Sequence, residues 1–241
     1  MWGNKMKPYY DKDGIIIYNG DCLEILDNLR LQGIEFIDTI FVSDPPFNVK
    51  YNYTEYKDNL PEDEYYAWLE TIFRNYKKVI IHYPESLYKF AFQIGEFPER
   101  VISWVYNSNT ARQHRDIAFF GISPDFTKVG QPYKNPKDKR IAKRIAEGKK
   151  AKLYDWWEVN QVKNVSKKHS HPCVMPEKVM ENIIGLLPEN NLILDPFMGS
   201  GTTLVAAKKL GRKAIGIELS EQYCQIAVER LENIFSQKTL F

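Results

Sequence analysis

Cysteine is scarce in this sequence, and long apolar runs are missing from it. The 241 residues include three cysteines, Cys22, Cys173 and Cys224, which form no CxxC pair. This spacing fits neither a disulfide framework nor a usual zinc site. No apolar run approaches the roughly 20 residues of a membrane span, and the amino-terminal segment is polar. We therefore expect a cytoplasmic protein, in a reducing compartment, that needs neither a metal nor a membrane.

A large excess of charge of one sign is also missing. Lys and Arg total 33 against 31 Asp and Glu, so net charge alone indicates no polyanionic partner. The average conceals one basic block, residues 134–152, with nine Lys or Arg against two acidic residues. A hydrophobic content of 44% is enough for a substantial core, so we expect one large domain or a domain with an insertion.

Short β-rich runs recur along the chain, and several are continuously apolar, which is typical of strands buried on both faces. We expect strands at residues 15–18, 38–43, 79–82, 101–106, 117–120, 192–194 and 214–217. Helical patterns lie between them, notably over 61–78, over 176–188 and after Ser220. The predicted fold is α/β, a largely parallel sheet of seven strands with helices on both faces.

The regular pattern stops over residues 123–166, which are rich in turn residues, then basic, then aromatic. We interpret this segment as an insertion outside the sheet. It divides the chain into a first part, 1–122, the insertion, 123–166, and a last part, 167–241.

A glycine-rich loop follows the strand expected at 192–194, in the stretch NLILDPFMGSGTTLVAAKK. Strand, loop, helix and second strand follow in the order of a nucleotide-binding βαβ unit, and Glu218 falls seventeen residues after Gly201. At that spacing a carboxylate can hold ribose hydroxyls. No GK[ST] follows the glycines, which disfavours a phosphate-binding loop. A ligand with a ribose and a cationic tail, such as S-adenosylmethionine, suits this loop and Asp195 at its start.

The stretch FVSDPPFNVKY, residues 41–51, predicts the chemistry. The exocyclic amine of a nucleobase is a poor nucleophile, and acceptors aimed at its N–H bonds activate it. The Asp44 carboxylate and the Pro45 carbonyl could supply them, because Pro45 and Pro46 stiffen the backbone. Phe47 offers a face on which a base flipped out of the duplex can stack. By itself a DPP sequence is more often a stiff turn that ends a strand.

Together, DPPF and DPFMGSGTT resemble the amino-methylating DNA methyltransferases of the β class, in which the catalytic motif precedes the cofactor motif. YNGDCLEIL (18–26) and HPCVMPEKVMENII (171–184) resemble further motifs of that family. HRDIAFFG (114–121) resembles a third, with Arg115 where Glu is common, so we assign that strand no catalytic role. The resemblance implies a Rossmann-like methyltransferase fold, S-adenosylmethionine as cofactor and duplex DNA as substrate. The cofactor-binding residues that we expect are Asp21, His171, Asp195, Phe197, Gly199, Gly201, Thr202 and Glu218.

The family divides by target base, and Asp in the first position of the motif favours adenine N6 over cytosine N4. In this family the insertion is the target recognition region, although a charge run is more often a solvated face. We expect phosphate contacts from Lys134, Lys137, Lys139, Arg140, Lys143 and Arg144. The resemblance further implies a bacterial or phage source and allows a homodimer and a restriction endonuclease that acts separately.

Several alternatives stay open. Methylation of cytosine N4 keeps the mechanism and changes the base, whereas methylation of RNA or of a protein amide changes the substrate. A fold that binds DNA without catalysis is a third alternative, although the intact motifs argue against it. Methylation of cytosine C5 needs a nucleophilic cysteine, and Cys173 lies in the wrong motif for it.

Overall fold

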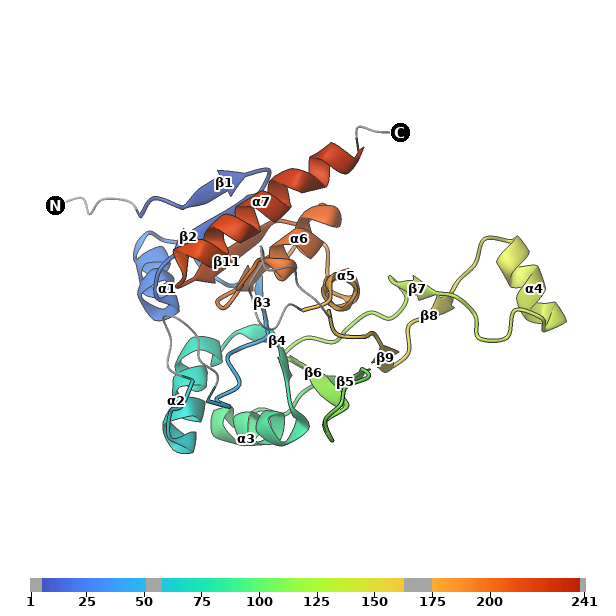
Figure 1. Ribbon diagram of the computed structural model, residues 1–241, viewed down its shortest axis with the longest axis horizontal. Helices are drawn as coiled ribbons and strands as arrows, with labels where there is room; N and C mark the ends of the chain where they lie inside the picture. Colours follow the sequence, from blue (N-terminus) through green and yellow to red (C-terminus); the bar gives the residue numbers. More distant parts are fainter. Residues whose placement is uncertain (1–5, 51–57, 163–174, 239–241) are drawn as a thin grey trace.

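A nine-stranded sheet organises this protein, which a computed structural model describes over residues 6–50, 58–162 and 175–238 (Figure 1). In spatial order the strands are β1 (Tyr10–Lys12), β2 (Ile15–Asn19), β11 (Ala214–Glu218), β10 (Leu192–Asp195), β3 (Thr39–Ser43), β4 (Lys77–His82), β6 (His114–Phe120), β5 (Arg100–Val105) and β9 (Trp156–Glu158). Within this sheet β1 and β6 run antiparallel to their neighbours, and the other pairs are parallel. The predicted α/β fold and all seven predicted strands are confirmed.

Helices cover both faces of the sheet (Figure 1). One face packs against α1 (Cys22–Leu31), α2 (Glu62–Phe73) and α3 (Pro84–Ile94), and the other against α5 (Glu177–Leu186), α6 (Thr202–Lys209) and α7 (Glu221–Lys238). Side chains along β3 point alternately to the two faces of the sheet, so this strand contributes to the cores under both helix layers. Ile40 and Val42 join the core under α5 to α7, whereas Phe41 joins the core under α1 to α3 and stacks on Tyr76. No helix in the described ranges is long and apolar enough to cross a bilayer.

Strands from the two ends of the chain interleave in this sheet. β2 pairs with β11, and β3 pairs with β10, so neither terminal part completes a sheet alone. The division into a catalytic half (1–122), a target recognition region (123–166) and a cofactor-binding half (167–241) therefore stays a prediction about roles. It does not describe separate folding units.

Two strands of the sheet were not predicted. β1 is a short edge strand of largely exposed residues and carries no apolar signal. β9 lies inside the range 123–166, which was expected outside the sheet, so that expectation is wrong at this point. The chain returns here because Trp157 is buried, and because the Trp104 indole nitrogen donates to the Val159 carbonyl at 2.6 Å.

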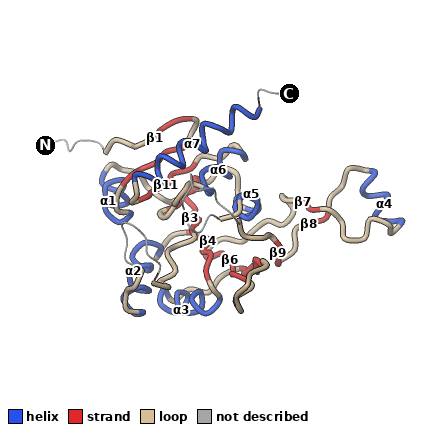
Figure 2. Tube along the Cα trace, in the orientation of Figure 1, coloured by secondary structure: helices blue, strands red, loops and turns tan. Residues whose placement is uncertain are grey.

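Residues 130–152 of the insertion extend away from the sheet (Figure 2), whereas Phe126 and Val129 before them pack against the core. The extended part contains α4 (Lys139–Ala146) and a small hairpin of β7 (Gly130–Gln131) and β8 (Ala151–Lys152). α4 has no buried residue, so it adds nothing to the core.

Arg212 joins α5 to the sheet from the loop before β11. Its side chain is buried, and its guanidinium donates to the carbonyls of Ile184 at 3.1 Å, Pro188 at 2.5 Å and Asn191 at 3.1 Å. Ile184 lies in the last turn of α5, where carbonyls have no partner within the helix. One cation thus satisfies the helix end and the loop that follows it.

Replacing this cation should destabilise the fold. We expect Arg212→Met to lower the free energy of unfolding by about 2 to 4 kcal/mol, because several buried carbonyls lose a donor. Urea unfolding measures the change. Lys12→Met is the matched control, since it breaks an exposed ion pair with Glu232 and should have no measurable effect. Equal losses of stability in the two variants would contradict this role of Arg212.

Candidate active site

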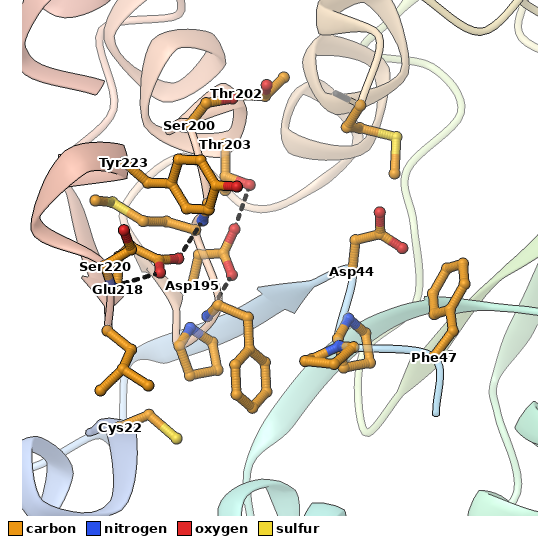
Figure 3. A pocket seen from close by; sticks show the side chains of 18 of the residues that line it. Cys22, Asp44, Phe47, Asp195, Ser200, Thr202, Thr203, Glu218, Ser220 and Tyr223 are labelled. Carbon is orange, nitrogen blue, oxygen red and sulfur yellow. Dashed lines mark hydrogen bonds between the residues drawn. The ribbon is translucent and has the colours of Figure 1, made fainter. Parts of the chain in front are cut away.

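A cavity of about 280 Å³ opens where the parallel strands β2, β3, β10 and β11 end (Figure 3). Ligands of open α/β sheets bind outside the carboxyl ends of the strands, because the loops that follow diverge there. The register brings acidic residues together at this edge. β3 leads into Asp44, β10 ends at Asp195 and β11 ends at Glu218.

Most of the residues predicted for the site line this one cavity. They are Asp21, Asp44, Pro45, Pro46, Phe47, Asp195, Phe197, Gly199, Thr202 and Glu218. Residues from both halves of the sequence therefore meet in one pocket. Their individual roles stay predictions.

Among the described residues predicted to hold the cofactor, Gly201 does not line the cavity. Gly201 precedes α6 with φ of 78°, and a Cβ there would lie 2.7 Å from the Cβ of Ala227. Its glycine is thus required for backbone geometry and for the approach of α7. His171 lies outside the described residues.

Asp44 is the first residue after the buried strand β3, and its carboxylate points into the cavity (Figure 3). Burial raises the pKa of Asp44 to about 6, while the Arg115 guanidinium acts against that rise. Arg115 Nη1 lies 3.4 Å from Asp44 Oδ2. Asp44 Oδ1 is buried and has no hydrogen-bond partner in the described part of the chain. The site therefore offers an acceptor with free lone pairs.

A buried chain of hydrogen bonds holds the backbone after Asp44. The Tyr65 hydroxyl lies 2.6 Å from the Pro46 carbonyl and 2.9 Å from His82 Nε2, while His82 Nδ1 accepts from the Tyr83 amide at 2.8 Å. Burial lowers the pKa of His82 to about 3, with Arg115 adding to the effect, so the ring is neutral. Because Nδ1 accepts, Nε2 carries the proton and donates to Tyr65. Tyr65 then donates to Pro46 and fixes the peptide that leads into Phe47.

A second contact holds the loop just beyond Phe47. The buried Asp58 carboxylate accepts from the amides of Asn48 at 2.7 Å and Val49 at 2.9 Å. Asn48 has φ of 55°, a left-handed conformation that asparagine tolerates better than most residues. The DPPF segment is therefore anchored at both ends.

Asp195 starts the glycine-rich loop. Its carboxylate accepts from the Phe197 amide at 3.0 Å and from the Thr203 hydroxyl at 2.5 Å (Figure 3). Burial raises the pKa of Asp195 to about 7 against these two hydrogen bonds, and the charges of Asp44 and Glu218 add to the rise. The site thus holds two carboxyl groups that ionise only reluctantly without a nearby cation.

Glu218 closes the loop from the next strand. One carboxylate oxygen accepts from the Gly199 amide at 3.0 Å, and the other accepts from the Ser220 amide at 2.9 Å (Figure 3). These contacts fix the carboxylate at the wall of the cavity. A carboxylate oxygen can accept more than one hydrogen bond, so the contacts leave capacity for a ligand hydroxyl.

Asp21 has a structural role that spacing alone did not indicate. It is the N-cap of α1, and its carboxylate accepts from the amides of Leu23 at 2.9 Å and Glu24 at 3.2 Å. It also lines the cavity. The two functions are compatible, because capping places the carboxylate at the helix end that faces the pocket.

The basic residues predicted to contact DNA lie on the insertion, away from this cavity (Figure 1). Lys139, Arg140, Lys143 and Arg144 are on α4, and Lys134 precedes it. The Lys134 ammonium lies 4.7 Å from the ring of Tyr154 and 4.4 Å from that of Trp156. Trp156 is 43% exposed and Trp157 is 4% exposed, so one tryptophan of the pair is core.

The sequence analysis missed other residues that line the cavity. They are Trp68, Tyr83, Arg115, Met175, Met180, Thr203, Ser220 and Tyr223, among others. Thr203 was detectable, because the second threonine of GSGTT lies one residue beyond a predicted one. Arg115 and Tyr83 come from strand β6 and from the end of β4, which only the tertiary structure brings to Asp44. Among the described residues, no group of three or more His, Cys, Asp or Glu could hold a metal ion.

Comparison with known proteins indicates the kind of chemistry that such a site performs. The family model with the description DNA methylase, for the N6 and N4 type, matches residues 37–229. Among curated proteins, the type II methyltransferase M.ScaI of Streptomyces caespitosus is 29% identical over 267 residues, covering 94% of this chain and 84% of the relative. The type II methyltransferase M.HpaI of Haemophilus parainfluenzae is 28% identical, covering 90% of this chain and 74% of the relative.

Solved structures support the fold. PvuII DNA methyltransferase, described as cytosine-N4-specific, superposes with a TM-score of 0.66 at 19% identity, covering 95% of this chain and 93% of the other. The M1.HpyAVI–SAM complex gives a TM-score of 0.60 at 23% identity, covering 90% of this chain and 99% of the other. At these identities the likeness concerns the fold alone.

The buried carboxyl groups should give the protein an unusual dependence of stability on pH. Asp44 and Asp195 have folded-state pKa values of about 6 and about 7, above the ordinary value of 3.8. Between pH 4 and pH 7 the folded state therefore holds protons that the unfolded state has released. The contribution of these groups to the free energy of unfolding falls as pH rises through that window.

Urea unfolding at pH 5 and pH 8 tests this expectation. The double variant Asp44→Asn, Asp195→Asn should lose less stability between the two pH values than the wild type, because the amides do not ionise. The other titrating groups are the same in both proteins, so their contributions to the pH dependence cancel in the comparison. An identical pH dependence in the two proteins would rule out the raised pKa values.

Proposed function

Because this chain belongs to the N6/N4 DNA methylase family, we propose that it transfers a methyl group from S-adenosylmethionine to the N6 amino group of an adenine in duplex DNA. The observation that carries the proposal is the meeting of Asp44 and Asp195 in one cavity. It brings the amino-activating motif beside the glycine-rich loop. A methyl donor on that loop would lie next to an amine held by Asp44.

The chemistry of the cavity fits S-adenosylmethionine. When bound, this cofactor supplies a methyl group on a positively charged sulfur, which a neutral amine can attack. A cationic ligand stabilises the ionised forms of Asp195 and Asp44, whose pKa values burial raises. Glu218 lines the cavity and would accept from ribose hydroxyls, and Phe197 packs on Trp68 with ring centroids 5.2 Å apart. The fold relative M1.HpyAVI is described as a complex with this cofactor.

Asp44 and Pro45 would activate the target amine. Asp44 Oδ1 is the buried acceptor without a partner among the described residues, and one amino hydrogen would satisfy it. The Pro45 carbonyl would accept the other. Two acceptors raise the electron density on the nitrogen and stabilise the charge that develops during attack. The proton leaves after transfer, and no covalent bond to the enzyme is needed.

Phe47 would support the flipped base. Its ring lies 4.5 Å from the ring of His82 and 4.9 Å from that of Tyr83, so the platform has several rings. The duplex loses one stacked pair when the base leaves it, and contacts of this kind offset part of that cost. The platform accepts any base and so does not set the choice between adenine and cytosine.

The choice of adenine depends on the first residue of the motif. Asp44 lines the cavity, whereas the preceding Ser43 is fully buried in β3 and does not line it. This placement supports Asp44 as the acceptor, as in the motifs that accompany adenine. Methylation of cytosine N4 stays the second candidate, because the same acceptors would bind its amino group.

The insertion would hold the DNA backbone. α4 has no buried residue and carries basic residues in both of its turns. Its separation from the cavity suits contacts to phosphates, which position a duplex without reading its sequence. A homodimer and a separate restriction endonuclease stay predictions.

Asp44→Ala should abolish methylation without abolishing cofactor binding. We expect turnover to fall at least about 100-fold, because an acceptor made for the transition state is removed. Methyl-labelled S-adenosylmethionine is incubated with unmethylated duplex DNA, and the labelled nucleoside is identified by mass spectrometry. Wild-type label in N6-methyladenine supports adenine, and label in N4-methylcytosine would correct the base.

The control for this experiment is Asp11→Ala on the exposed edge strand β1. It removes one carboxylate far from the cavity and should keep wild-type turnover. Near-normal methylation by Asp44→Ala would remove the proposed mechanism. If the wild type binds the cofactor and yet labels none of the DNA nucleosides, that result would favour an RNA or protein substrate or a catalytically silent protein.

Neutralising α4 should weaken DNA binding at low salt and reduce its salt dependence. The variant replaces Lys139, Arg140, Lys143 and Arg144 by Gln. The slope of log affinity against log salt should fall by about 0.9 for each phosphate that the variant no longer neutralises. Fluorescence anisotropy with a labelled duplex at several salt concentrations measures it, and cofactor affinity should stay unchanged.

A control with the same change in net charge separates local phosphate binding from overall attraction. It replaces four cations outside the insertion by Gln, namely Lys7, Lys12, Arg74 and Lys89. Equal slopes for the two variants would show that α4 makes no special interaction with DNA.

A further inference from the structure

We propose that Arg115 is a positioning residue for the methyl transfer, whose guanidinium keeps the Asp44 carboxyl ionised and supports the Phe47 ring from inside the protein. The inference rests on the proposed function and deepens it. The sequence analysis assigned this strand no catalytic role, since Arg115 stands where the related motif commonly has Glu.

The topology explains how Arg115 reaches the site. β6 runs antiparallel to β4, so its amino-terminal end lies at the edge where the parallel strands have their carboxyl ends. In register, Asp116 pairs with His82, the last residue of β4. Arg115 is one residue nearer to the edge of the sheet, and it lines the cavity.

Two interactions connect Arg115 to the proposed machinery. Its Nη1 lies 3.4 Å from Asp44 Oδ2, and its Cζ lies 4.5 Å from the centroid of the Phe47 ring. The Arg115 side chain is 8% exposed and that of Asp44 is 19% exposed, so little water screens the pair. One side chain thus touches both the acceptor and the platform.

Aromatic rings hold the guanidinium in place. Its Cζ lies 5.4 Å from the centroid of Trp104, 5.8 Å from that of Tyr83 and 6.0 Å from that of Tyr106. A planar cation is attracted to the electron-rich faces of aromatic rings, and the surrounding rings restrict its rotation. Among the ion pairs of the described residues, the carboxylate that pairs with Arg115 is that of Asp44.

The groups that face Asp44 come from four elements. Arg115 on β6 is cationic, His82 at the end of β4 is neutral, and Asp195 at the end of β10 is a second carboxyl. Tyr106, just after β5, has a pKa raised by burial and stays protonated at neutral pH. Arg115 is therefore the group that offsets the burial of Asp44. Without it, burial alone would act, and the pKa of Asp44 would rise above about 6.

The test compares Arg115→Met, Arg115→Lys and the control Arg112→Met. Methionine keeps the length and the packing of the stem but removes the charge, and lysine restores a charge without the planar fork. Arg112 is an exposed neighbour that pairs with Glu85 and lies 4.2 Å from the centroid of the same Tyr83 ring. It has no ion pair with Asp44 among those described.

The first readout is the pKa of Asp44 in the protein without DNA. Carboxyl carbon chemical shifts are followed by NMR, with the signal assigned by its absence in Asp44→Asn. Removal of the opposite charge should raise this pKa by about 1 to 3 in Arg115→Met. Arg115→Lys should lie between that variant and the wild type, and Arg112→Met should match the wild type.

The second readout is the pH profile of methylation. For a pKa rise of about 2, turnover of Arg115→Met at pH 7 should fall about tenfold and recover toward pH 9, because only the ionised Asp44 opposes the positive charge that develops on the amine. A merely structural loss would lower turnover equally at every pH. Cofactor affinity and the thermal midpoint identify a variant that has failed to fold, and Arg115→Lys then supplies the test.

The outcomes separate this inference from the proposed function. An unchanged pKa of Asp44 in both Arg115 variants overturns the inference even if the wild type methylates adenine. Turnover of Arg115→Met at pH 7 that equals or exceeds that of the wild type also overturns the inference. It would mean that the guanidinium occupies the place of the target base. If the wild type methylates no nucleic acid, the proposed function fails, while the NMR titration still decides whether Arg115 sets the ionisation of Asp44.

Discussion

The burial of carboxyl groups at one edge of the sheet is the constraint on which the rest of this structure depends. Parallel strands place Asp44, Asp195 and Glu218 around one cavity, where Asp195 is buried and the other two are partly buried. A buried carboxylate is stable only with hydrogen bonds or an opposite charge. Glu218 and Asp195 use backbone amides and a threonine hydroxyl, whereas Asp44 uses an arginine. The site is consequently prepared for a cationic ligand.

Rigid support follows from the same requirement. Under the proposed function, an acceptor aimed at a reacting amine would be effective only if it need not reorganise, so the surrounding loops would have to be held. The Tyr65 and His82 chain holds the DPPF backbone on one side of the cavity. On the other side, Arg230 donates to the Ser200 carbonyl at 2.6 Å and to the Thr202 hydroxyl at 3.1 Å, which fixes the glycine-rich loop against α7.

Charge has a different use in the insertion. There the basic residues are exposed on α4 and satisfy no buried group, whereas Arg115 beside the cavity is buried and paired. Exposed charge acts at a distance and is screened by salt, while buried charge sets the ionisation of a neighbour. Under the proposed function, the molecule would thus separate attraction of a polyanion from activation of one amine.

The sequence by itself determined the seven central strands and the order of the two motifs. Most of the residues that it predicted for the site do line the cavity. Apolar runs, glycines and prolines act on their own backbone, so local chemistry is sufficient to predict them. Only the tertiary structure decided the position of Arg115 beside Asp44, the Tyr65 and His82 chain, and the return of β9 to the sheet edge. Each of these depends on a pairing between segments far apart in the chain, and β6 in particular reaches the site only because it runs antiparallel. Burial then set the ionisation of Asp44 and Asp195, because the desolvation of a carboxyl group depends on everything packed around it.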